Sequence, residues 1–294
     1  GPEQNIKWKR EMPAWSGSSP VVWGDKIFIN SPSKEEVTAP AEPAPGAGRK
    51  RPGGKGPARR GPDGQELLLL CRSRATGEEI WRRQLDRGNV IQMKQNSSSP
   101  SPVTDGKHVW VVSGNGRIGC YDVDGNERWK FDIREKYGAI GTGYGYGSSP
   151  VLLDGKLILQ VLHGRKTDDP SYVFALNAAS GEVLWRVERP TDALDESPDA
   201  YTTPTVLEIG GKKQIVVLGG DYVTGHDTET GAELWRSGGL NPEKSRNYRV
   251  VPSPVVRDGM IFAPTRQRPL LALKAGGSGD ITTSQLAWSW TGGA

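Results

Sequence analysis

Short apolar runs, separated by glycine, proline and aspartate, recur along the whole chain. Many runs come in pairs joined by Asp-Gly or Gly-Asp, as in VVWGDKIFI (21–29) and VLLDGKLILQV (151–161). Aspartate and glycine tolerate the positive φ angles of tight turns, so each pair predicts a β-hairpin. No apolar pattern with a 3.6-residue period persists over these segments, which argues against a fold built from repeated helices.

Two signatures repeat in alternation. The first is a serine or threonine before proline at the start of a hairpin: Ser19-Pro20, Ser101-Pro102, Ser149-Pro150, Thr203-Pro204 and Ser253-Pro254. The second runs from a small residue through a polar turn with glycine to a tryptophan, and it occupies 71–81, 120–129, 175–185 and 225–235. A degenerate fifth copy ends at Trp288, and Trp8 stands in the same register before the first hairpin.

Each repeat of roughly 50 residues therefore supplies two hairpins, or four short strands. This predicts an all-β fold, a β-propeller of four-stranded antiparallel blades with about five repeats, as a single domain over 1–294. The absence of any Trp-Asp dipeptide disfavours a WD40 propeller, and Gly-Gly doublets do not recur once per repeat as in kelch proteins. A large indole suits the gap between neighbouring sheets. The expected blade-docking residues are Trp8, Trp81, Trp129, Trp185, Trp235 and Trp288.

The positive charge is concentrated in one segment. The chain carries a formal net charge of +4, yet 48–62 alone holds Arg49, Lys50, Arg51, Lys55, Arg59 and Arg60 and no acid, so the remainder is 4 − 6 = −2. The Pro/Gly/basic stretch 31–65 has few apolar residues, which predicts a disordered insertion within the first blade. The alternative is a tether to an anionic surface. No aromatic residues are interleaved with these charges, so we expect no specific nucleic-acid binding.

Composition excludes two further classes. No run approaches 18 apolar residues, so no transmembrane segment is expected. Two cysteines, Cys71 and Cys120, do not make a disulfide scaffold, and both occupy the small-residue position of the second signature. We interpret them as buried fillers, with a disulfide or a reactive thiol as the alternative.

The pattern A-x-[DN]-x-x-[ST]-G-x-x-x-W, complete in Ala175 to Trp185, resembles the tryptophan-docking repeat of the pyrroloquinoline-quinone (PQQ)-binding-like propeller family. GYGSSPVL and GGDYVTGHDTETGAELWR resemble the same family, which is similar in repeat to the propeller lipoprotein of the outer-membrane assembly machine. That family usually closes seven or eight blades. The resemblance therefore implies an incomplete propeller, a fragment, and a periplasmic or secreted location.

The resemblance also raises the question of a quinone cofactor. Quinoprotein dehydrogenases carry an adjacent Cys-Cys pair and a calcium site of Glu, Asn and Asp, and no Cys-Cys dipeptide occurs here. His108, His163 and His226 do not stand at metal-ligand spacing. The acidic loop with Asp192, Asp195, Glu196 and Asp199 suits calcium by its oxygen ligands, although a solvated loop is the default. We therefore expect neither PQQ nor calcium from the residues present.

Polar and aromatic residues precede the first strand of each repeat, where propeller loops surround the mouth of the channel. Aromatic bodies with polar tips on converging loops predict a recognition rim, and local packing is the alternative. The candidates are Trp15, Asn96, Tyr144, Tyr146, Tyr201, Tyr248 and Arg249.

Three functions remain open. The first is a non-catalytic binding or scaffold module of the bacterial cell envelope, whose propeller face takes a protein, peptide or glycan. The second is a PQQ-dependent dehydrogenase whose site lies partly in missing blades. The third is a sensor or adhesion module tethered by the basic insertion. We expect the first, and no catalytic residue is assigned. Fold alone does not decide among them, because propellers host many functions.

Overall fold

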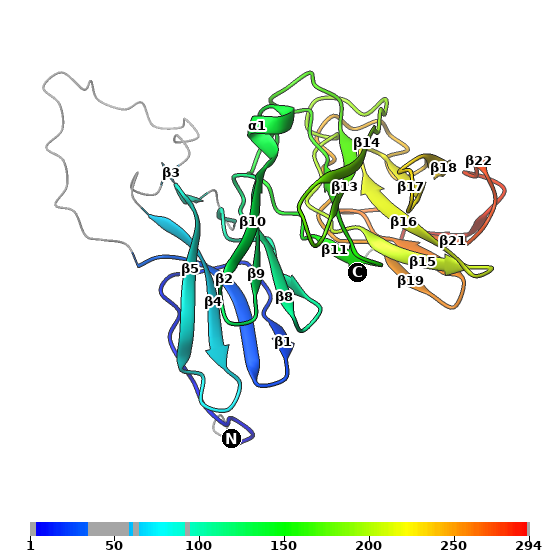
Figure 1. Ribbon diagram of the computed structural model, residues 1–294. Helices are drawn as coiled ribbons and strands as arrows, with labels where there is room; N and C mark the ends of the chain where they lie inside the picture. Colours follow the sequence, from blue (N-terminus) through cyan, green and yellow to red (C-terminus); the bar gives the residue numbers. More distant parts are fainter. Residues whose placement is uncertain (1–3, 35–58, 61–64, 92–94, 293–294) are drawn as a thin grey trace, which may run out of the picture.

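The computed structural model of the protein describes residues 4–34, 59–60, 65–91 and 95–292. Within these ranges the chain forms five successive sheets built on four antiparallel strands, which we call blades 1 to 5 (Figure 1). A fifth strand joins the sheet of blade 4, and two further short strands pair separately. This confirms the predicted all-β propeller class. Asp132 caps the helix α1 (Ile133–Tyr137), which follows blade 2.

The strands of each blade follow one another in the chain. Blade 1 contains β1 (Val21–Trp23), β2 (Lys26–Pro32), β4 (Glu66–Ser73) and β5 (Glu79–Arg87). Blade 2 contains β7 (Val103–Thr104), β8 (His108–Val112), β9 (Arg117–Asp122) and β10 (Glu127–Asp132). Blade 3 contains β11 (Val151–Leu153), β12 (Lys156–Val161), β13 (Tyr172–Asn177) and β14 (Val183–Glu188). Blade 4 contains β15 (Thr205–Ile209), β16 (Lys212–Gly219), β17 (Tyr222–Asp227) and β18 (Glu233–Ser237). Blade 5 contains β19 (Val255–Arg257), β20 (Met260–Ala263), β21 (Leu270–Lys274) and β23 (Leu286–Trp290).

The first strand of each blade is the innermost one. β1 contacts β7, β7 contacts β11, and β15 contacts β19, whereas the fourth strands lie at the outer edge. Since the four strands run up and down in order, the turn between the first and second strands and the turn between the third and fourth strands lie at one end of a blade. The segments that enter and leave each blade, and the connection between its second and third strands, lie at the opposite end, which we call the loop face.

Tryptophans connect the outer strands of successive blades. The indole N–H groups of Trp8, Trp81, Trp129 and Trp185 donate to the backbone oxygens of Arg74, Val123, Ala178 and Thr228, at 2.9, 3.1, 3.0 and 3.2 Å respectively. Each acceptor occupies the same position in the turn of the following second signature. At the last of these turns, a Cβ added to Gly231, whose φ is +76°, would lie 2.4 Å from the Trp185 ring. Glycine is therefore required there both for backbone conformation and for space.

The small residue that begins the second signature is the cross-strand partner of the tryptophan. Trp81 pairs with Cys71, Trp129 with Cys120 and Trp185 with Ala175. A β-bulge precedes the tryptophan in every outer strand. Both cysteines are free and buried, and burial raises the pKa of Cys71 to about 11 and that of Cys120 to about 12. They occupy the positions of buried fillers.

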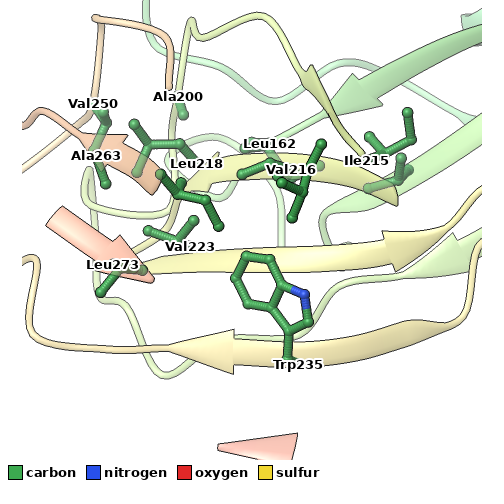
Figure 2. Packing of buried hydrophobic residues seen from close by; sticks show 14 of the residues in the cluster. Leu162, Ala200, Ile215, Val216, Leu218, Val223, Trp235, Val250, Ala263 and Leu273 are labelled. Carbon is green, nitrogen blue, oxygen red and sulfur yellow. The ribbon is translucent and has the colours of Figure 1, made fainter. Parts of the chain in front are cut away.

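Trp235 departs from the expected inter-blade position. It pairs with Gly225, which has no side chain, and its indole N–H donates to the side chain of Gln214 in the same blade at 2.8 Å. The short strand β22 (Gly279–Asp280), which belongs to the connection between β21 and β23, pairs in parallel with β18 beside it. In blade 5 a longer connection thus replaces the usual short turn. Trp235 belongs to an apolar cluster that blades 3, 4 and 5 build together (Figure 2).

Trp288 also differs from the preceding tryptophans. Within the described chain no following turn covers it, and its side chain is 45% exposed. Trp288 still contacts the second strand of its own blade: its ring centroid lies 6.1 Å from that of Phe262. In blade 1 the ring centroids of Trp81 and Phe28 lie 5.9 Å apart in the same way.

A second set of contacts connects the blades at their inner strands. The backbone N–H groups of Ser19, Ser101, Ser149 and Thr203 donate to the hydroxyl oxygens of Ser101, Ser149, Thr203 and Ser253, at 2.9, 2.9, 3.1 and 2.8 Å respectively. These are the residues before proline in the first signature. The following proline favours an extended backbone at this position. The Ser/Thr-Pro signature therefore marks an inter-blade hydrogen bond, which the sequence reasoning missed.

Part of the insertion expected at 31–65 is described. Ser31 and Pro32, which the prediction assigned to the insertion, instead pair with Leu68 and Leu67 at the end of β2, because the buried leucine run 67–70 offers them a strand partner. The strand β3 (Arg59–Arg60) pairs with β6 (Val90–Ile91). Residues 35–58 and 61–64 lie outside the described residues, so disorder there stays a prediction.

The docking role can be tested at Trp185, which is buried between blades 3 and 4. Trp185→Ala should lower the free energy of unfolding by about 3–5 kcal/mol, because it leaves a large cavity against the turn of blade 4. Trp288→Ala, at the exposed copy, should cost about 1 kcal/mol or less. Urea denaturation followed by circular dichroism measures both. A loss below about 1 kcal/mol for Trp185→Ala would contradict the docking assignment.

Candidate functional site

The loop face carries the predicted rim residues, and Trp15 is the exposed one among them. Its side chain is 54% exposed. Asn96 is buried directly behind it and donates from its amide nitrogen to the backbone oxygen of Trp15 at 2.7 Å. The Asn96 oxygen in turn accepts from the backbone N–H and the hydroxyl of Ser98. Asn96 therefore fixes the loop that presents the indole, instead of offering its amide to a ligand.

Two pockets share Ala14 and Trp15 in their linings. One, of about 440 Å³, is lined by Met12, Ala14, Trp15 and Ile29 together with Glu11 and Ser16. The other, of about 370 Å³, is lined by Pro13, Ala14, Trp15, Lys34, Gln65, Asn89 and Asn96. In the second pocket, Asn89 donates to Gln65 at 2.8 Å and Gln65 donates to the Ser33 oxygen at 2.7 Å. The polar floor is thus engaged in its own hydrogen bonds, and the apolar wall with the indole remains for a partner.

Tyr144, Tyr201 and Arg249 come together in a second group. The Arg249 guanidinium carbon lies 4.5 Å from the centroid of the Tyr144 ring, and that of Arg165 lies 5.7 Å from it. Tyr144 and Tyr201 pack edge to face at 6.2 Å. The hydroxyl of Tyr201 accepts from the backbone N–H of Tyr144 at 3.0 Å. We call this group, with the acids Glu196 and Asp199, the loop latch.

Glu196 forms ion pairs with both arginines of the loop latch. Its carboxylate pairs with Arg165 at 2.9 Å and with Arg249, and its side chain is nearly buried. The buried carboxylate of Asp199 accepts from the backbone N–H groups of Gly143 and Arg165, at 2.6 and 3.1 Å. Burial raises the pKa of Asp199, and burial together with the Asp199 charge raises the pKa of Tyr201. The latch ties the loops before blades 3, 4 and 5 to one another.

The four carboxylates proposed as a calcium loop face different partners. Asp192 pairs with Lys244 at 2.7 Å, Asp195 pairs with Arg246, and the other two belong to the loop latch. In the part of the chain that the structure describes, no group of three or more His, Cys, Asp or Glu side chains could hold a metal ion. The acidic loop is engaged in structural contacts.

Tyr146 and Tyr248 lie away from the exposed rim. The hydroxyl of buried Tyr146 donates to the backbone oxygen of Gln160 at 2.9 Å. Tyr248 is also buried, and its hydroxyl bonds Thr265 at 3.0 Å and the backbone of Arg268. It forms one wall of a third pocket of about 440 Å³, with Asn241, Glu243, Gln267 and Arg268. The structure therefore places the seven rim residues in separate groups and not on one surface.

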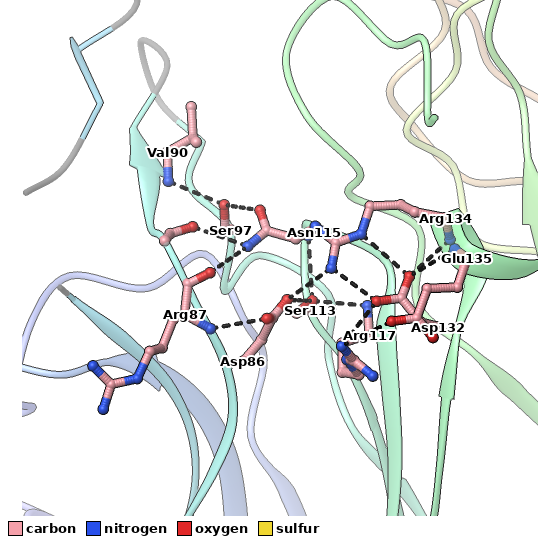
Figure 3. Close-up of polar contacts among 11 residues, drawn as sticks. Asp86, Arg87, Val90, Ser97, Ser113, Asn115, Arg117, Asp132, Arg134 and Glu135 are labelled. Carbon is pink, nitrogen blue, oxygen red and sulfur yellow. Dashed lines mark hydrogen bonds and ion pairs between the residues drawn. The ribbon is translucent and has the colours of Figure 1, made fainter. Parts of the chain in front are cut away.

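A polar network joins blades 1 and 2 at the same face (Figure 3). The Asn115 amide donates to the backbone oxygens of Arg87 and Gly88, and its own oxygen accepts from Ser97 at 3.0 Å. Asp86 accepts from the Ser113 hydroxyl at 3.0 Å and faces Arg134 at 3.7 Å. Neither this network nor Arg165 in the latch was predicted, because single polar residues in loops carry no periodic signal. No helix among the described residues is long and apolar enough to cross a membrane.

The loop latch makes a prediction about stability. Glu196→Gln would leave Arg165 and Arg249 around a neutral amide, which should lower the free energy of unfolding by about 2 kcal/mol. This loss of stability is smaller than that expected for a fully buried ion pair, because Arg165 is partly exposed. Glu243→Gln is the control, since that exposed acid has no ion pair among the described residues, and it should change stability by about 0.5 kcal/mol or less. Equal losses in urea denaturation for the two variants would contradict the role of the latch.

Comparison with known proteins places this fold in a family. Residues 68–291 match the family model described as outer membrane protein assembly factor BamB. The chain is 24% identical over 232 residues to the protein of that name from Yersinia pestis, covering 75% of this chain and 51% of the relative. It is 26% identical over 186 residues to methanol dehydrogenase [cytochrome c] subunit 1 of Methylobacterium organophilum, covering 55% of this chain and 28% of the relative.

A solved structure extends the likeness in fold. The europium-containing methanol dehydrogenase superposes with a TM-score of 0.62 at 11% identity, covering 94% of this chain and 50% of that one. The chain thus spans about half or less of the length of these proteins. With a family match over most of its length and five four-stranded blades in sequence, the chain belongs to the PQQ-like propeller repeat family described as outer membrane protein assembly factor BamB.

Proposed function

We propose that this protein is a non-catalytic binding or scaffold module of the bacterial cell envelope, which holds an extended polypeptide at Trp15 on the loop face. The observation that carries the proposal is the exposed Trp15 side chain, which lines two pockets and whose backbone oxygen accepts from the buried Asn96 amide. Aromatic side chains with a fixed backbone make effective anchors, because they bury a large area at low entropic cost. The family name, an assembly factor for outer membrane proteins, supports a polypeptide as the partner.

The chemistry of the pocket walls also favours a polypeptide over a glycan. Sugar hydroxyls are bound by free hydrogen-bonding groups, and the amides of Asn89, Asn96 and Gln65 are already engaged in the structure. The apolar part of the lining suits apolar side chains, and Glu11, Ser16 and Lys34 add polar groups beside it; the apolar residues are Met12, Pro13, Ala14, Trp15 and Ile29. An extended chain would place successive side chains on either side of the indole.

A dehydrogenase is the second candidate, because the methanol dehydrogenase subunit is among the relatives. The described residues do not fit a quinone with calcium. Glu196 and Asp199, the most buried carboxylates of the acidic loop, already accept from two arginines and two backbone N–H groups. The two cysteines lie in different blades, each under a tryptophan.

The binding proposal is tested with a labelled ten-residue peptide that alternates valine and tyrosine with threonine and serine, the pattern of outer-membrane strands. Trp15→Ala should weaken binding about tenfold or more in fluorescence anisotropy, because it removes the anchor, and should leave the melting temperature unchanged. Trp23→Ala is the matched control, since Trp23 is 53% exposed at the opposite end of blade 1. Unchanged affinity for Trp15→Ala, or an equal loss for Trp23→Ala, would count against the site.

The dehydrogenase alternative needs its own measurement. Titration of PQQ with calcium into the protein, followed by calorimetry and quinone absorbance, should give no saturable signal. Saturable micromolar binding with a spectral change would replace the scaffold proposal by the quinoprotein one.

A further inference from the structure

The contact between blades 3 and 4 contains a buried arginine with neutral partners. Arg189 follows β14 and its side chain is 1% exposed. Its Nε donates to the Thr224 hydroxyl at 2.8 Å, and one terminal nitrogen donates to the backbone oxygen of Tyr222 at 2.9 Å. Both acceptors belong to β17. Among the described residues Arg189 forms no ion pair, so blade 3 inserts into blade 4 a buried arginine whose direct partners are neutral oxygens.

His226 continues this chain of hydrogen bonds. Its Nε2 lies 2.9 Å from the Thr224 hydroxyl, and its Nδ1 lies 2.9 Å from the backbone oxygen of Gly231. A carbonyl oxygen only accepts, so Nδ1 carries the hydrogen. Thr224 accepts from Arg189 and its single hydrogen then points to the lone pair of Nε2. The network is fully satisfied only while the imidazole is neutral.

The charges around His226 oppose its protonation. Arg189 lies on the other side of the same hydroxyl, and Arg236 of β18 adds a second positive charge. Glu233, opposite His226 in the sheet register, is engaged by Arg236 at 2.5 Å. Asp227, the next residue along β17, turns its carboxylate to the backbone N–H groups of Glu229 and Thr230. On the remaining side, β16 places Ile215 against His226.

The same imidazole supports the turn under Trp185. Gly231, which accepts from His226, lies directly below the Trp185 ring, and Trp185 donates to Thr228 in that turn. His226 is therefore connected to both contacts that blade 3 makes with blade 4 here. One is Arg189, through Thr224, and the other is Trp185, through the turn that contains Gly231.

We propose that the contact between blades 3 and 4 is an acid-sensitive joint: a proton on His226 reverses the hydrogen bond to Thr224 and places a second positive charge beside Arg189, which favours opening of the Arg189 contact and, with it, of the turn under Trp185. A protonated Nε2 would donate to the Thr224 oxygen, which already accepts from Arg189. The hydroxyl hydrogen would then lose its acceptor in a site that excludes water. The joint would open without any change in the loop latch.

The sign of the effect follows from linkage. Burial, together with the neighbouring positive charges, lowers the pKa of His226 from 6.5 to about 4. Between these values the open state takes up a proton that the closed state does not. Opening should therefore become about tenfold more favourable for each pH unit from 6.5 down to 4, and be independent of this residue above 7.

Hydrogen–deuterium exchange between pH 7.5 and 4.5, corrected for intrinsic rates, tests the proposal. Wild type should lose protection in β14, β17 and the 227–232 turn as the pH falls. His226→Asn keeps an amide N–H near the position of Nδ1 and cannot take the proton, so its protection should be nearly independent of pH. His108→Asn is the control, because His108 is partly exposed and lies in blade 2.

Two results would overturn the proposal. One is an unchanged pH dependence in His226→Asn; the other is acid opening confined to 162–171, where buried His163 accepts from Gly141 and contacts Pro170. If His226→Asn fails to fold, a measurement on the wild-type protein still tests the proposal. Nuclear magnetic resonance titration of the three histidines should place His226 well below 6.5, and a value at or above 6.5 refutes the joint.

Discussion

Each blade of this propeller donates hydrogen bonds to the next blade along the chain, and the structure depends on that constraint. At the outer strands of blades 1, 2 and 3 the donor is an indole N–H and the acceptor a turn carbonyl of the following blade. At the inner strands the donor is a backbone N–H and the acceptor a serine or threonine hydroxyl. Four-stranded sheets bury little apolar area alone, so these contacts set how one sheet faces the next and let the apolar clusters close between them.

The sequence predicted the blades because their signals are periodic. Paired strands around Asp-Gly, the small residue opposite tryptophan and the glycine of the turn recur in fixed order, and each recurrence supports the others. Where the periodic signal fails, the prediction fails with it. Gly225 is small like Ala175, but the absence of a side chain lets the Trp235 ring pack within its own blade, and no sequence rule distinguishes the two cases.

The candidate site was less accessible to sequence reasoning. Position before an inner strand does place a residue on the loop face, but it does not say which side chains stay exposed. Trp15 and Tyr146 occupy similar positions, yet one is presented to solvent and the other bonds the Gln160 carbonyl inside the fold. The difference comes from contacts between loops far apart in sequence, such as Glu196 with Arg249. Such pairs carry no spacing signal, and neither does the Arg189 side chain that enters blade 4.

The strand β22 has a consequence for how such a chain can change its number of blades. Blades 1, 2 and 3 each donate from an indole to the turn of the next blade and from a backbone N–H to the hydroxyl before its first proline, so gain or loss of one whole repeat among them would preserve these two recurring bonds. Blades 4 and 5 are different, because Gly279 and Asp280 of one complete the sheet of the other. A duplication that separated these two repeats would leave β18 without its neighbour. These two blades are therefore coupled through a shared sheet, whereas the sheets of blades 1, 2 and 3 are each completed by strands of their own repeat.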